Sequence, residues 1–486
     1  MGQPPSYTAS FAPGGAGGAA STPRASSLRQ PAPAQTAAQP SSDAQPAPRP
    51  QTNGALPYSA PPAFAAQPPG SGPLAPPPQT YGAPPNWQPP DPFTPLSPGP
   101  YPVVPPPPRP VRPALPEMVY VVTAKFWFRP EALLWDTKAA PVPQPIATSG
   151  STADAVPGAI GQPGTLVVFG GGTASFGYVG GVRLETGIWL DEGRVFGLEA
   201  GYFVLIQQSR EFSQQSDGFG NPVIARPTID ARSGGEGSHV DSLPDQFLGG
   251  VDVILRSEFQ GANCDGVLNL LQTQRVRLDG LLGFRYLSLV ESLNIYDQSS
   301  DFLGGGSTFG GAPLSTSATL SDFDGFRLTN SFYGGSGGAR LYYAQGRFYF
   351  TALGKIAFGT VQQRATISGS TLFTNPQGVR TMLPGGVLAT TANMGNYYQN
   401  PYAVAPEGHF NLGYQISPSV TARIGYSFIY LSNVARPGDQ VSRVTSANRI
   451  PSDPAYGGTG PVPPAFQFHT STYWAQGLNF GLDFRF

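Results

Sequence analysis

The last thirteen residues of the chain, 474–486, alternate between large apolar side chains and small or polar ones. A period of two is the pattern of a β-strand with one apolar and one polar face. At about 3.3 Å per residue this strand would span roughly 43 Å, which is long for a soluble strand and sufficient for a tilted membrane strand. Alternation that ends on a terminal aromatic is typical of the last strand of a bacterial outer-membrane β-barrel. The pattern predicts a C-terminal assembly signal that must pair with the first strand to remove the open sheet edges, with the apolar side chains Leu478, Phe480, Leu482, Phe484 and Phe486.

The same alternation recurs through residues 118–486, whereas helical spacing never persists for three turns. We therefore expect an all-β fold, namely a transmembrane, up-and-down, antiparallel β-barrel of about 10 strands, within a range of about 10–12. The predicted strands lie near residues 124–136, 174–190, 194–209, 245–257, 273–291, 324–343, 346–361, 405–417, 419–433 and 470–486.

The predicted connections alternate in length. Those after the second, sixth and eighth strands are tight, the one at 258–272 is intermediate, and the other five are long. Outer-membrane barrels have short periplasmic turns and longer extracellular loops, whereas a soluble sandwich has no reason to sort its loops by length. The order of the connections therefore favours a membrane barrel.

Residues 1–117 differ in composition from the rest of the chain. They hold 35 of the 56 prolines and only eight charged residues. Because they contain too few large apolar side chains to offset the entropy of ordering, we expect a disordered, Pro-rich segment. The predicted division is a periplasmic extension or spacer at 1–117, which could contact cell-wall or periplasmic components, and the barrel at 118–486.

Composition narrows the remaining function classes. A net charge of −1 argues against nucleic acid as a partner and against a polybasic membrane anchor. The single cysteine, Cys264, excludes an internal disulfide framework, and the absence of a run of about 18 apolar residues predicts no transmembrane helix. Residues 1–20 lack the basic and apolar stretches of a signal peptide, so we expect either a misplaced start or a signal already removed.

The three histidines, His239, His409 and His469, are the candidates for acid–base chemistry. His239 lies in a long predicted loop near Asp241 and Asp245, where a rim-mounted hydrolase of the barrel-protease kind could keep a His–Asp pair. A solvated polar loop is the simpler interpretation and is preferred. The sequence has no Gly-x-Ser-x-Gly motif and no metal-ligand spacing of His, Cys and carboxylates. We therefore expect no enzymatic activity, no metal site and no cofactor.

Charged residues on the polar strand faces are expected to point into the lumen, because on the lipid side each would cost about 2–4 kcal/mol near the midplane. Ten strands are close to the size at which side chains fill the interior, so charges of both signs favour a plug over a selective pore. Aromatic residues lie toward strand ends and predict interfacial girdles: Trp127, Trp135, Trp189, Tyr202, Tyr342, Tyr343, Tyr430 and Trp474. The predicted lumen-facing charges are Arg183, Glu185, Glu199, Asp252, Arg256, Arg275, Arg277, Asp279, Arg285, Arg347, Lys355, Arg423, Asp483 and Arg485.

Six stretches in a fixed order make up much of this part of the chain: FRPEALLWDTKAAPVPQPIATSG at 128–150, GVRLETGIWLDEGRVFGLEAGYFVL at 181–205, LDGLLGFRYLSLVESLNIYD at 278–297, FRLTNSFYGGSGGARL at 326–341, APEGHFNLGYQIS at 405–417 and FHTSTYWAQGLNFGLDFRF at 468–486. This series resembles the planctomycete outer-membrane proteins of beta-barrel porin family seven. The resemblance covers roughly 118–486 and implies a porin-like barrel in the outer membrane. It implies no characterised substrate and no catalytic residues.

These patterns together predict a structural, porin-like outer-membrane β-barrel with at most a narrow pore for small solutes. Its expected partners are outer-membrane lipid and, through the C-terminal strand, the barrel-assembly machinery. The expected location is the outer membrane, with the N-terminal region in the periplasm. The alternative is a soluble secreted or surface-exposed β-protein that binds ligands or adheres through its long loops.

Overall fold

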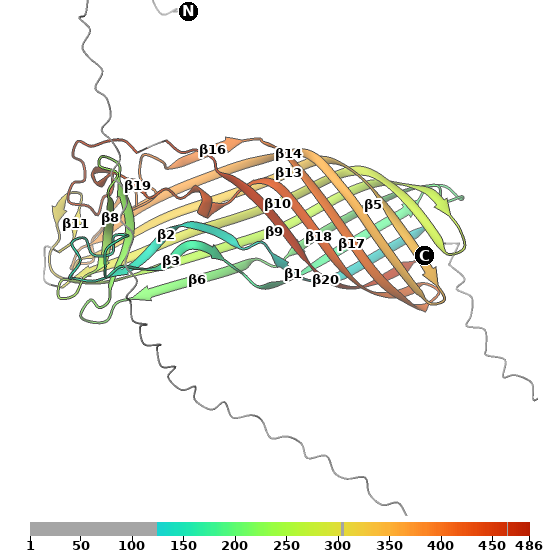
Figure 1. The fold of residues 1–486 in the computed structure, drawn as a ribbon, viewed down its shortest axis with the longest axis horizontal. Helices are drawn as coiled ribbons and strands as arrows, with labels where there is room; N and C mark the ends of the chain where they lie inside the picture. The colour runs from blue at the N-terminus through green and yellow to red at the C-terminus, as the bar shows by residue number, and fades with distance from the viewer. Residues whose placement is uncertain (1–123, 303–305, 464) are drawn as a thin grey trace, which may run out of the picture. The chain divides into compact units, whose positions relative to one another are not determined.

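The computed structural model describes residues 124–302, 306–463 and 465–486, and the segment predicted to be disordered, 1–117, lies outside them. Ten strands form a closed antiparallel ring (Figure 1) in the order β1–β4–β5–β9–β10–β13–β14–β17–β18–β20, with β20 paired to β1. The ten-strand, all-β prediction is confirmed. The ring strands are β1 Phe126–Thr137, β4 Tyr178–Trp189, β5 Phe196–Leu205, β9 Phe247–Gln272, β10 Val276–Asp301, β13 Thr319–Gln345, β14 Phe348–Thr374, β17 Tyr402–Ser417, β18 Val420–Ala435 and β20 Thr470–Arg485.

The first and last strands pair from Trp127 to Thr137 and close the ring, and the terminal residue extends this pairing. The Phe126 N–H donates to the Phe486 carbonyl at 3.1 Å, and the Phe486 N–H donates to the Phe126 carbonyl at 2.9 Å. The two rings also pack with their centroids 6.2 Å apart. The closure leaves neither β1 nor β20 with an unpaired edge along this register.

All short turns lie at one end of the ring, at 190–195, 273–275, 346–347 and 418–419, and the long connections lie at the other. The intermediate connection predicted at 258–272 is wrong, because these residues continue β9 and pair with β10 as far as Gln272. Glycines and inward polar residues such as Asn263 interrupt the apolar alternation there, which explains the missed strand. The turn between β9 and β10 is three residues long, so it joins the other short turns at one end of the ring.

Four neighbouring strands are much longer than a membrane requires. β9 and β10 have 26 residues each and β13 and β14 have 27 each, whereas about 9–11 residues span a bilayer. Their ends at the long-loop side carry added strands: β6 Gln208–Gln215 pairs with β9, and β15 Arg380–Pro384 and β16 Gly395–Gln399 pair with β14. The barrel wall therefore continues beyond the membrane as a sheet.

The long connections are also partly ordered, which the sequence did not predict. A second sheet forms at the long-loop end (Figure 1). Its strands are β2 Ala140–Gly150, β3 Leu166–Ala174, β7 Val223–Asp230, β8 Glu236–Ser242 and β19 Val444–Thr445. The remaining short elements are β11 Thr308–Phe309, β12 Ala312–Pro313 and the 3₁₀ helices η1 Pro437–Gln440 and η2 Ala447–Arg449.

Large apolar side chains form an outward belt around the ring near the short-turn end. Such a belt is the surface that a barrel presents to lipid. It includes Leu184, Leu198, Leu282, Phe284, Phe350, Phe358, Phe410, Leu412, Ile424, Leu478 and Phe480, all exposed. Among the described residues, no helix has the length and apolar content that crossing a membrane would require.

Three of the four tryptophans predicted to form girdles point inward instead. Trp127, Trp135 and Trp189 are 7%, 0% and 6% exposed. The indole rings of Trp127 and Trp189 pack against each other at 5.5 Å between centroids. In these strands the tryptophans share the face of the charged residues rather than the lipid face, so this part of the girdle prediction is wrong.

Candidate functional site

A layer of buried apolar side chains, here named the apolar layer, fills the lumen. Every one of the ten ring strands contributes to it. Aromatic rings run across it: the centroids of Trp135 and Phe203 are 5.5 Å apart, those of Phe203 and Phe259 5.2 Å, and those of Phe259 and Tyr473 4.9 Å. The layer consists of Leu133, Trp135, Val179, Phe203, Leu205, Phe259, Leu287, Leu289, Phe332, Ala357, Val361, Ala403, Ala405, Ile429, Leu431, Val434, Tyr473 and Ala475.

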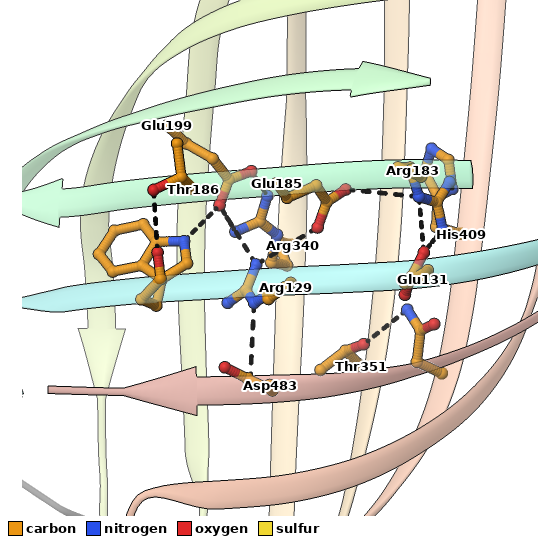
Figure 2. A network of polar contacts seen from close by, with 12 residues as sticks. Arg129, Glu131, Arg183, Glu185, Thr186, Glu199, Arg340, Thr351, His409 and Asp483 are labelled. Carbon is orange, nitrogen blue, oxygen red and sulfur yellow. Dashed lines mark hydrogen bonds and ion pairs between the residues drawn. The ribbon is translucent and has the colours of Figure 1, made fainter. Parts of the chain in front are cut away.

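On the short-turn side of this layer lies a set of buried ion pairs, here named the lumen network (Figure 2). Glu199 on β5 is one centre of it. Its carboxylate accepts hydrogen bonds from Arg129 Nη1 at 3.3 Å, Arg340 Nη1 at 2.8 Å and the Trp127 indole at 3.2 Å. Arg129 also faces Asp483 at 3.6 Å. Strands β1, β5, β13 and β20 are thereby joined across the lumen.

Glu131 on β1 is a second centre of the lumen network. Arg183 Nε donates to its Oε2 at 2.6 Å, and Arg423 Nη2 lies 2.7 Å from its Oε1. Arg183 Nη1 reaches further, to His409 Nδ1 at 3.0 Å and to the Ser427 hydroxyl at 3.1 Å. The Glu131 side chain is only 1% exposed, so these two guanidinium groups supply its counter-charge in place of water.

A third group completes the lumen network. Lys355 Nζ donates to Asp265 Oδ2 at 2.6 Å and lies 3.5 Å from Glu407 Oε1. Arg285 Nη2 lies 2.6 Å from Glu407 Oε2. All four side chains are at most 6% exposed. Because each buried charge has an opposite charge beside it, the network is tolerable in a low-dielectric interior.

Two small cavities lie within the lumen network. Each has a volume of about 20 Å³, which is room for about one water molecule. One is lined by Arg285, Lys355 and Glu407 among others, and the second by Arg129, Arg423 and Asp483 among others. Neither cavity is large enough to hold a solute much bigger than water.

Ten of the fourteen charges predicted to face the lumen lie inside the ring, and four do not. Asp252 and Arg256 lie on the outer face of β9, because Val251, Val253 and Leu255 are the buried residues of that stretch. Arg275 and Arg347 are exposed in short turns, outside the strands. The ten that lie inside are Arg183, Glu185, Glu199, Arg277, Asp279, Arg285, Lys355, Arg423, Asp483 and Arg485.

Sequence reasoning also missed several members of the lumen network. Arg129 and Glu131 alternate with the outward residues of β1 and could have been found by the same pattern that gave Arg183. Asp265 was hidden because its segment was taken for a connection. The other missed members are Arg340, Glu407 and His409.

A second charged site lies at the long-loop end, beyond the apolar belt. His239 and Asp241 are not in a solvated loop, as the sequence had suggested, but on one face of β8. His239 Nε2 lies 3.8 Å from Asp241 Oδ1 and 3.5 Å from Asp322 Oδ2. Asp297 on β10 and Asp322 on β13 are direct cross-strand partners. We name this set the rim cluster: Arg226, His239, Asp241, Asp297, Asp322 and Asp324.

Arg226 on β7 provides the guanidinium of the rim cluster. Its Nη1 lies 2.7 Å from Asp297 Oδ2 and 2.6 Å from Asp324 Oδ2. Asp324 is further satisfied by the backbone N–H groups of Leu388 and Ala389, at 3.1 and 2.6 Å. Four buried carboxylates thus surround one arginine and one histidine, which leaves negative charge in excess.

The electrostatics of the rim cluster follow from that excess. Burial and the adjacent charge of Asp322 raise the pKa of Asp297 to about 7. Burial and the charge of Asp297 likewise raise the pKa of Asp241 well above its usual value. Burial alone would lower the pKa of His239, but its hydrogen bond to Asp322 and the nearby aspartates outweigh burial and raise that pKa to about 9.

Residues 127–486 match the family described as "Putative beta barrel porin-7 (BBP7)". The chain belongs to this family. The match spans all ten ring strands apart from the first residue of β1 and agrees with the closed ring, so the protein is an outer-membrane β-barrel. The soluble, secreted alternative is therefore not retained. No curated protein matches the chain.

Solved outer-membrane barrels give only weak likenesses. The outer membrane protease OmpT from Escherichia coli is 10% identical with a TM-score of 0.33, and the match covers 75% of this chain and 97% of that one. A FadL homologue from Pseudomonas aeruginosa is 10% identical, with a TM-score of 0.19 and coverage of 74% and 89%. The toluene transporter TbuX from Ralstonia pickettii is 9% identical, with a TM-score of 0.14 and coverage of 77% and 92%.

One of these matches bears on the expectation that the chain is not an enzyme. The expectation is contradicted, because the first of the three proteins is a protease. The match assigns no activity to this chain, because the TM-score is 0.33.

Proposed function

We propose that this outer-membrane barrel is closed across its lumen and acts as a structural barrel that passes small solutes at most. The observation that carries the proposal is the apolar layer, to which all ten ring strands contribute. A hydrophobic constriction of this kind excludes water and the ions that travel with it. The aromatic contacts from Trp135 to Tyr473 cross the lumen at this level.

The lumen network supports the same proposal. A selective pore keeps its charges hydrated and available to solutes, whereas Glu131, Glu199 and Lys355 are at most 3% exposed at their side chains and bound to opposite charges. An ion that entered would have to displace these partners, which leaves buried charges uncompensated. The lumen network and the apolar layer together form a barrier that is polar on the short-turn side and apolar on the long-loop side.

Conductance in planar bilayers tests this function. The purified wild-type protein should show no large, steady open channel. The variant Phe203→Ala with Phe259→Ala removes the two middle rings of the aromatic contacts, so it should admit brief, small currents. The matched control Leu198→Ala with Phe284→Ala shortens two side chains of the lipid-facing belt and should remain as silent as the wild type. Steady wild-type currents of general-porin size would overturn the proposal.

Two further assignments belong to this proposal. The C-terminal strand would be recognised by the barrel-assembly machinery, which the exposed outward face of Leu478 and Phe480 and the closing role of Phe486 support. Residues 1–117 would form a periplasmic spacer toward cell-wall or periplasmic components. In a polyproline conformation of about 3.1 Å per residue, about 110 residues of such a segment could reach roughly 340 Å.

A further inference from the structure

The rim cluster brings together three possible metal donors from two strands that lie far apart in the sequence. His239 and Asp241 come from β8 and Asp297 from β10, and one donor atom of each lies within 4.8 Å of the others. Sequence spacing could not indicate this set, because 56 residues separate Asp241 from Asp297 along the chain. The set gives one imidazole nitrogen and two carboxylates converging on one point.

One carboxylate of this set also carries an oxygen without a partner. Asp241 is 1% exposed, and its Oδ2 has no hydrogen-bond partner among the described residues. Burying a carboxylate oxygen without a hydrogen-bond partner costs folding free energy, and a bound ligand would offset that cost. The cross-strand pair Asp297 and Asp322 adds a second unfavourable feature, because like charges directly opposite each other destabilise a sheet.

Charge identifies the kind of ligand. A metal binds neutral imidazole and ionised carboxylates. In that form the cluster holds four negative charges and one guanidinium, Arg226, which leaves three negative charges in excess. A divalent cation would reduce this excess to one and would supply the missing partner of Asp241. The imidazole disfavours Ca²⁺ and Mg²⁺, which take oxygen ligands, and suits Zn²⁺, which accepts histidine and carboxylate together.

We propose that His239, Asp241 and Asp297 bind a divalent transition-metal cation of the Zn²⁺ class at the extracellular rim of the barrel. Zinc bonds to these donors are about 2.0–2.2 Å long, so the donor atoms must approach one another by about an ångström. His239 Nε2 and Asp241 Oδ1 are already 3.8 Å apart. With three protein ligands, the fourth position is free for water or a ligand of the metal. The ion would fasten the second sheet, through β8, to the extended wall formed by β10.

Zinc titration of the full-length, untagged protein, refolded in detergent, tests the site. A Cys264→Ser background removes the only thiol of the chain. Calorimetry with ZnCl₂ should give one site per chain. The variants His239→Gln and Asp241→Asn should each weaken zinc binding at least tenfold. The control His469→Gln, which alters an exposed histidine outside the cluster, should bind as the background protein does.

Heat-modifiable gel mobility checks that each variant is folded. X-ray absorption of the zinc-loaded background protein provides a measurement that needs no variant. It should show nitrogen and oxygen ligands in a shell of about four. Absence of stoichiometric binding, equal affinity in folded His239→Gln and His469→Gln, or a shell of oxygen alone would each overturn the site.

Discussion

Neutralising Glu131 tests whether the lumen network stabilises the barrel. The substitution Glu131→Gln keeps the shape of the side chain and removes its charge. Both guanidinium partners stay in place, with the side chains of Arg183 and Arg423 5% and 7% exposed. Breaking a buried ion pair by removing one partner costs about 3–5 kcal/mol, because the remaining charge is left uncompensated.

The expected loss lies at the lower end of that range. Arg183 keeps a second carboxylate, Glu185, at 3.8 Å and the Ser427 hydroxyl at 3.1 Å. Arg423 has no other ion pair within 4.0 Å among the described side chains. We therefore expect a loss of about 3 kcal/mol in the free energy of unfolding, which is roughly a hundredfold in the folding equilibrium.

Urea unfolding in lipid vesicles, followed by tryptophan fluorescence, measures this change. The control Glu192→Gln neutralises an exposed glutamate in the turn between β4 and β5 and should stay within about 0.5 kcal/mol of the wild type. Adding Arg423→Met to Glu131→Gln should recover part of the loss, since the stranded guanidinium is then gone. A Glu131→Gln protein as stable as the Glu192→Gln control would refute the reasoning.

Three other predictions follow from the wall of the barrel. Deletion of Phe486 removes the two outermost hydrogen bonds between the first and last strands and the terminal ring of the assembly signal, and should abolish insertion, seen as loss of heat-modifiable mobility; normal assembly would mean that the terminal residue is incidental. In a background without the native thiol, Arg256→Cys should react rapidly with a hydrophilic thiol reagent and Leu198→Cys should be shielded by lipid, so equal labelling would contradict the belt boundary. Gly187→Ala would overlap a buried indole ring and should cost about 1–3 kcal/mol, whereas Gly354→Ala meets nothing within 4 Å and should be neutral; the reverse order would contradict the packing.

The strand count was predictable because one face of every ring strand meets lipid. On β10, Leu282 and Phe284 alternate with Gly283 and Arg285, and the lipid face alone reveals the strand. The pattern says which side chains point inward. It does not say which strand lies opposite across the lumen or at what height, because those depend on the tilt and stagger of the closed ring.

The partners inside the lumen therefore could not be predicted. Glu199 binds Arg340, which is 141 residues away, and Arg183 binds Ser427, which is 244 residues away. The rim cluster could not be predicted either, because the strand that carries His239 has no recognisable pattern. His239 lies in a strand of the second sheet, and its short polar sequence, Glu236–Ser242, carries no apolar alternation that would distinguish it from a loop.

Asp252 and Arg256 were predicted to face the lumen but lie on the outer face, and the reason applies to the whole barrel wall. Along β9 the same parity points inward throughout, from Val251, Val253 and Leu255 to Asn263 and Asp265. Near the short-turn end the inward residues are polar and the outward ones apolar, because lipid lies outside. Beyond the membrane the outside is water, so the inward residues become apolar and the outward ones polar. Polarity alone therefore identifies the inward face of a barrel strand only within the lipid belt, and the residue at which the two faces exchange polarity marks the edge of the membrane on the long-loop side.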